Sequence, residues 1–158
     1  MFRPLSLAAI AAIAFSQIAC APVSYQKTDS GAQPTLAMAT QNWQQVSGSV
    51  LPAVDDLVNQ ADAEIAMNHW DVASEKLERA LRSSPEYAPA WSRLSQIALH
   101  RQEPQRAIQM AKRSNSHAGK AVDLKLLNWQ YIREASEMLD DVEGVQNANK
   151  AIYILQSL

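Results

Sequence analysis

Hydrophobic residues follow three successive patterns along the chain. An apolar run from Leu5 to Phe15 covers about eleven positions near the N-terminus. Residues 21–50 are rich in Ser, Thr, Gln, Ala, Pro and Gly and show no apolar periodicity. From Leu51 onward, apolar residues recur at the spacing of an amphipathic helix, and prolines mark where helices begin or end. These patterns predict an N-terminal targeting segment at 1–19, a flexible tether at 20–50 and a helical domain at 51–158.

The helical domain contains an internal repeat. The segments NHWDVASEKLERALRSSPEYAPAW and RQEPQRAIQMAKRSNSHAG align at a shift of about 34 residues, so that Ala73 corresponds to Ala107 and Ala80 to Ser114. Both the period and the residue types resemble the tetratricopeptide repeat (TPR), a pair of antiparallel helices. The resemblance implies an all-α fold, a short TPR-like solenoid of about two and a half to three helical hairpins.

Small residues recur where the paired helices are expected to cross, because only a small side chain lets two helix backbones approach closely. The predicted contact points are Ala61, Ala73, Ala80, Ser95 and Ala107. At the first hairpin turn Asn68 stands where the family usually has glycine, and asparagine tolerates the left-handed conformation that ends a helix. Gln102 takes that place in the second repeat.

A third unit follows with a shifted register. Gly144, Ala148 and Ala151 echo Ala107, Ala111 and Ser114, but about 37 residues on instead of 34. We interpret this unit as a degenerate repeat or a capping hairpin, because each repeat buries its apolar face only against a neighbour.

Candidate catalytic chemistry is sparse. His69, His100 and His117 have no second ligand at metal-binding spacing. The SYQK motif at Ser24–Lys27 formally matches S-x-x-K but lies in the predicted tether without the other motifs of that enzyme class. We therefore predict a non-catalytic protein without a metal, a small-molecule substrate or a cofactor.

Charge narrows the class of partner. Removing residues 1–19 would remove one basic residue, Arg3, and leave 13 Lys and Arg (14 − 1) against 16 Asp and Glu, a net charge of −3. This balance is too mild and too mixed to favour nucleic acid. A protein partner is the remaining expectation.

The TPR resemblance also implies a binding groove. In TPR proteins the first helix of each hairpin lines a concave face that suits an extended peptide or a partner helix. Transferred to this chain by repeat position, the groove residues are Val58, Asp62, Ser92, Gln96, Leu99 and His100, with Asn128 and Tyr131 continuing them in the third unit.

The N-terminal run is too short to cross a bilayer as a helix, which needs roughly 20 apolar residues, and fits the hydrophobic part of a signal peptide. Ile18 and Ala19 before Cys20 resemble the end of a bacterial lipobox, although Gln17 replaces the usual leucine. This resemblance implies lipidation of Cys20 and, with Ala21 next, an outer-membrane lipoprotein that faces the periplasm. The rival interpretation is ordinary cleavage at the ACA site or after AFS, where no acyl chain such as palmitate would be attached.

The whole layout resembles the TPR-containing LpoP-type outer-membrane lipoproteins, with RSNSHAG and NWQYI in the repeat domain. That resemblance implies a partner, a class A penicillin-binding protein, the bifunctional peptidoglycan synthase that such lipoproteins activate. A tether of about 30 residues would span at most about 100 Å. Two alternatives remain open: a scaffold or pilotin-like assembly lipoprotein for a secretion or pilus machine, and an adaptor for envelope hydrolases.

One residue of the predicted tether stands out. Trp43 is the single large aromatic between residues 30 and 50. It either packs back on the helical domain or contacts a partner, and the sequence leaves both options open.

Overall fold

The computed structural model describes residues 39–41, 43 and 52–158, all within one compact unit, Ala32–Leu158. The predicted signal peptide, Cys20 and most of the predicted tether lie outside the described residues.

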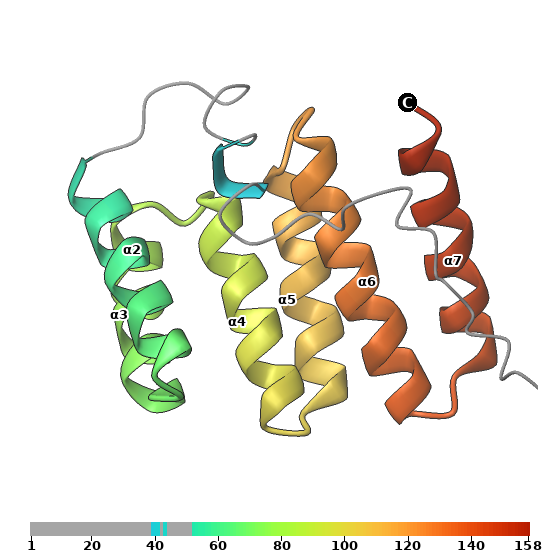
Figure 1. Cartoon of the computed structure of the whole chain (residues 1–158), viewed down its shortest axis with the longest axis horizontal. Helices are drawn as coiled ribbons and strands as arrows, with labels where there is room; N and C mark the ends of the chain where they lie inside the picture. The colour runs from blue at the N-terminus through green and yellow to red at the C-terminus, as the bar shows by residue number, and fades with distance from the viewer. Residues whose placement is uncertain (1–38, 42, 44–51) are drawn as a thin grey trace, which may run out of the picture. The chain divides into compact units, whose positions relative to one another are not determined.

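Between residues 52 and 158 the chain forms six helices arranged as three successive antiparallel hairpins, as the sequence predicted (Figure 1). In order, the helices are α2 (Pro52–Ala66), α3 (Trp70–Ser83), α4 (Ala88–His100), α5 (Pro104–His117), α6 (Val122–Met138) and α7 (Val142–Gln156). The first helix of each later hairpin packs on the hairpin before it: α4 contacts α3, and α6 contacts α4 and α5.

The same turn closes all three hairpins. Asn68, Gln102 and Asp140 adopt left-handed backbone conformations, with φ of 61°, 58° and 54°. In each turn the following residue donates its backbone N–H to a carbonyl five residues back at 2.9 Å, the bond that defines a Schellman motif. The prediction for Asn68 is confirmed. Gln102 adopts the same left-handed conformation, although glutamine, unlike asparagine, has no preference for it.

The small residues at the crossings are buried as predicted. Ala61, Ala73, Ala80, Ser95 and Ala107 have no exposed surface. The Ser95 hydroxyl also donates to the carbonyl of Ala107 at 2.8 Å, which links the two helices of the second hairpin where they approach. Replacing any of these residues by a larger one would push the helices apart, because the interior is close-packed.

The third hairpin is a complete helix pair, and its shifted register has a simple cause. Helix α6 begins 34 residues after α4, but it has 17 residues where α4 has 13. The four additional residues make about one helical turn, so α7 starts 38 residues after α5. Ala148 nonetheless occupies the buried position that Ala111 has in the second hairpin, and both are fully buried.

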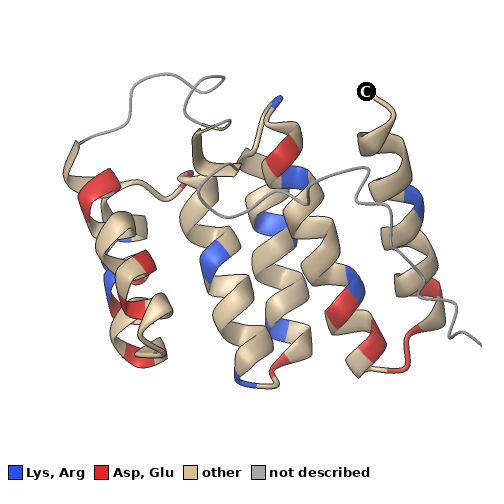
Figure 2. Ribbon diagram, in the orientation of Figure 1, with Lys and Arg blue, Asp and Glu red and all other residues tan. Residues whose placement is uncertain are grey.

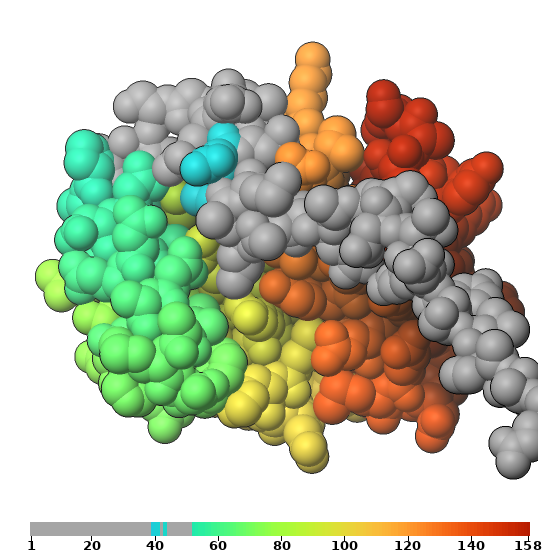
Figure 3. All heavy atoms as spheres, viewed as in Figure 1, coloured from blue at the N-terminus to red at the C-terminus, as the bar shows by residue number. Residues whose placement is uncertain are grey.

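Residues upstream of the predicted domain start belong to the core. Ala39 and Trp43 are helical and buried, and they join the apolar cluster that contains Val54, Val58 and Tyr87. The Trp43 indole donates to the carbonyl of His117 at 3.2 Å, and its ring meets the Tyr87 ring edge to face at 4.7 Å. Trp43 therefore packs back on the domain, and the core reaches beyond residue 51 towards the N-terminus. Figure 3 shows this segment in blue beside α2.

We expect Trp43→Ala to lower the free energy of unfolding by about 3 kcal/mol, because it removes a buried aromatic ring and leaves a cavity. Urea unfolding followed by circular dichroism measures the change. The matched control is Gln41→Ala, an exposed position in the same segment, which we expect to change stability by less than about 0.5 kcal/mol. Equal stabilities for the Trp43 variant and the wild type would show that this segment does not belong to the folded domain.

Gln102→Gly should stabilise the protein by about 0.5–1 kcal/mol, because glycine adopts a positive φ without steric cost. Gln109→Gly, at an exposed position inside α5, should destabilise it by a similar amount. Thermal unfolding of the two variants is the measurement, and a loss of stability at residue 102 would contradict the turn geometry.

Candidate functional site: the face of the first helices

Half of the predicted groove residues are interior residues in this structure. The exposed fractions of Val58, Ser92, Leu99 and Asn128 are 1%, 0%, 8% and 0%. Helix α4 is buried on several sides because it packs against α3, α5 and α6, so repeat positions that would face solvent on an isolated hairpin are covered. The solvent-facing placement expected for these four residues is therefore corrected, and their contact with a partner stays a prediction.

Asn128 has a structural role that accounts for its burial. Its amide nitrogen donates to the Ser114 hydroxyl at 2.8 Å and to the Asn115 side-chain oxygen at 2.9 Å. Ser114 in turn donates to the carbonyl of Ala88 at 2.8 Å. This chain of hydrogen bonds joins α6 to α5 and α5 to the start of α4.

Asp62 is held in an ion pair with Arg93, a residue outside the predicted groove. Arg93 is the only charged residue of α4 apart from a terminal histidine, and just 1% of it is exposed. Its guanidinium contacts both carboxylate oxygens of Asp62 and donates to the Pro89 carbonyl at 3.1 Å and to the Thr40 hydroxyl at 2.9 Å. One side chain thus connects α2, α4 and the N-terminal segment. A single arginine in a helix without any other Lys, Arg, Asp or Glu was the signal that could have revealed it.

Tyr131 lies near this ion pair. Burial raises the pKa of the Tyr131 phenol above its ordinary value, while the positive charge of Arg93 acts in the opposite direction. The phenol therefore stays neutral at physiological pH. On α4, the Ser92 hydroxyl and the Gln96 side-chain oxygen, one helical turn apart, are buried without a hydrogen-bond partner.

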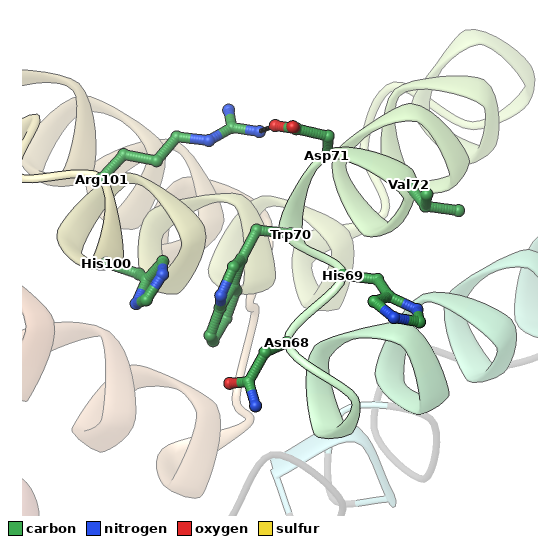
Figure 4. Close-up of a pocket in the computed structure, with 7 residues that line it drawn as sticks. All are labelled: Asn68, His69, Trp70, Asp71, Val72, His100 and Arg101. Atoms are coloured by element: carbon green, nitrogen blue, oxygen red, sulfur yellow. Dashed lines mark hydrogen bonds and ion pairs between the residues drawn. The ribbon is translucent and has the colours of Figure 1, made fainter.

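His100 is the one predicted groove residue with an exposed side chain, and it lies at the hairpin-turn end of the stack. Its ring stacks on Trp70 with centroids 3.9 Å apart, and the neighbouring Arg101 pairs with Asp71 at 2.5 Å (Figure 4). With Asn68, His69 and Val72 these residues line an open pocket of about 390 Å³. Across the described ranges 39–41, 43 and 52–158 no cluster of three His, Cys, Asp or Glu side chains could hold a metal ion.

Comparison with known proteins supports the repeat architecture. Residues 58–116 match the tetratricopeptide repeat family. No curated protein and no solved structure matches the chain.

The fold and this match define the class of protein. Residues 52–158 form TPR-like helical hairpins, and residues 58–116 of them are similar to the tetratricopeptide repeat family. Tetratricopeptide repeats indicate a protein–protein interaction module. No helix in the part of the chain that the structure describes is long and apolar enough to cross a membrane.

Asp62→Ala should lower the free energy of unfolding by about 3 kcal/mol, because it leaves the buried Arg93 guanidinium without its carboxylate. Adding Arg93→Met should bring the free energy of unfolding back towards the wild-type value, because the unpaired buried charge disappears. Chemical unfolding of both variants tests the pair.

The control is Asp71→Ala, which breaks an ion pair whose aspartate is 95% exposed and should cost less than about 0.5 kcal/mol. A similar small cost for Asp62→Ala would mean that the Arg93 ion pair does not hold the hairpins together.

Proposed function

We propose that this protein is an outer-membrane lipoprotein, anchored through Cys20, whose helical domain binds a class A penicillin-binding protein and activates it. The observation that carries the proposal is the stack of consecutive TPR-like hairpins at residues 52–117, which supports a protein-binding role. The lipobox-like residues before Cys20 support the anchor. The resemblance of the whole layout to LpoP-type lipoproteins supports the choice of synthase as partner.

The proposed mechanism is allosteric. The domain would bind a conformation of the synthase in which glycan polymerisation and crosslinking are faster, and shift the equilibrium towards it. Anchoring the protein at a membrane raises its effective concentration near the synthase, so that weak contacts suffice.

The docked Trp43 limits how far the anchored domain can extend. Since Ala39 and Trp43 belong to the core, the free tether after Cys20 is at most residues 21–38. Eighteen residues (38 − 21 + 1) span at most about 60 Å when fully extended, compared with the 100 Å expected for the whole linker. The synthase would therefore have to meet the domain within this shorter distance of the outer membrane.

The same observation favours a second candidate. A pilotin-like lipoprotein that assists assembly of a secretion or pilus machine works beside its own membrane and needs no long tether. Only eighteen residues separate Cys20 from the buried Ala39 along the chain, which agrees with that role.

The partner is tested by affinity capture from solubilised envelopes with the full mature chain, followed by glycan polymerisation with the purified components. We expect recovery of a bifunctional synthase and faster polymerisation when the lipoprotein is present. Recovery of a secretin without synthase would favour the second candidate and exclude the first.

The anchor is tested separately by Cys20→Ser. We expect the variant to accumulate as an unprocessed precursor, and mass spectrometry of the wild-type N-terminus to show acyl chains. Ser24→Ala is the control for a change near the cleavage site. Normal processing of the Cys20 variant would support ordinary signal-peptide cleavage instead.

A further inference from the structure

The second helices of the hairpins flank two clefts, each with a tryptophan of a first helix among its lining residues. One cleft lies between α3 and α5, encloses about 390 Å³ and includes Trp91 of α4. The other lies between α5 and α7, encloses about 550 Å³ and includes Trp129 of α6. Both volumes fall in the range of about 300–1,000 Å³ that is typical of ligand pockets.

The cleft between α3 and α5 is apolar at its base. Leu81, Trp91, Leu94 and Met110 line it, and Trp91 is fixed by donating its indole N–H to the Pro85 carbonyl at 2.8 Å. Trp91 and Met110 are only partly buried, so the base of the cleft is open to a partner side chain.

Three arginines surround this base. Arg82 comes from α3, and Arg106 and Arg113 come from α5; all three are exposed. The Arg113 guanidinium lies over the Trp91 ring at 4.3 Å from its centroid, which joins the cationic rim to the aromatic base. Arg106 pairs with Glu103 at 3.2 Å, and no ion pair involves Arg82 among the described residues.

The charge of the cleft is opposite to that of the chain. Three arginines against one glutamate, Glu78, give a formal charge of +2, while the whole chain carries −2. Helix α5 carries basic and no acidic residues, whereas α2 carries acidic and no basic ones (Figure 2). The cleft between α5 and α7 differs, because Lys112 there faces Asp141 and Glu143 and the formal charge is −1.

We propose that the cleft between α3 and α5 binds an acidic segment of a protein partner, with one apolar side chain of that segment on Trp91 and its carboxylates on Arg82 and Arg113. Charge complementarity selects this occupant, since an apolar base within a cationic rim fits a segment in which apolar and acidic residues alternate. The proposal rests on the protein-binding role but does not require the partner to be a synthase.

The probe is the peptide acetyl-EELEELEE-amide, titrated into the full ¹⁵N-labelled chain and followed through the indole N–H resonances of the four tryptophans. The Trp91 resonance, assigned with Trp91→Phe, should move, while that of Trp129 stays in place as an internal control. The peptide acetyl-EESEESEE-amide, which has serine in place of both leucines, should bind more weakly. Movement of Trp129 and not Trp91 would overturn the proposal.

Charge reversal locates the contact. Arg82→Glu combined with Arg113→Glu should weaken peptide binding about tenfold, since two attractive charge pairs become repulsive. The matched control is Arg79→Glu combined with Lys112→Glu, which makes the same charge changes on the same two helices away from the cleft. Equal weakening by both double variants would mean that net charge, not the cleft, attracts the peptide.

The same variants separate this proposal from the proposed function. If the synthase is captured by the wild type and equally by the Arg82→Glu, Arg113→Glu variant, the cleft is excluded as the synthase-binding surface while the synthase remains the partner. Each variant must have a circular dichroism spectrum that matches the wild type. If the Arg82→Glu, Arg113→Glu variant fails this requirement, the Arg82→Gln, Arg113→Gln variant replaces it.

Discussion

Close approach of helix backbones at a few small residues is the constraint on which this structure depends. Alanine or serine stands at each crossing, so two helices pack without a side chain between them. The buried hydroxyls of Ser95 and Ser114 add hydrogen bonds to backbone carbonyls across the same crossings. These contacts fix the distance between neighbouring helices and leave the larger residues, such as Leu77 and Trp91, to fill the space around them.

Buried charge adds a second level of organisation to this packing. Hydrophobic contacts between the first and second hairpins have no preferred direction. The hydrogen bonds that the Arg93 guanidinium donates to Asp62 and Thr40 are directional, so they favour one placement of these two residues. A buried ion pair is weak evidence for stability, but removing one of its partners is costly because the other charge stays buried. The N-terminal segment is part of that arrangement through Thr40 and Trp43. An anchored protein would therefore have its tether end inside the fold and not at its first long helix.

The sequence predicted the repeated features well and the single ones poorly. The period of 34 residues, the crossing alanines and the Asn68 turn all occur more than once, so each instance supports the others. Arg93 and Trp43 occur once, and nothing in a periodic pattern indicates where such side chains find partners. The burial of individual groove residues was also out of reach of the sequence: repeat position identifies a helix face, but the burial of Ser92 and Asn128 depends on how neighbouring helices cover that face. The extra turn of α6 likewise became visible only once the helix ends were known.

The two sides of the stack consequently offer different surfaces to a partner. On the first-helix side half of the predicted groove residues are buried by internal contacts, while the second-helix side has an open cleft lined by Trp91 and three arginines. The most direct test is hydroxyl-radical footprinting of the protein alone and in complex with its captured partner. We expect Trp91 and Met110 to lose reactivity in the complex, while the exposed Tyr153 of α7 keeps its reactivity. Unchanged oxidation of Trp91 and Met110, with protection of Tyr131 and Gln96-containing peptides on the first-helix side, would contradict this expectation.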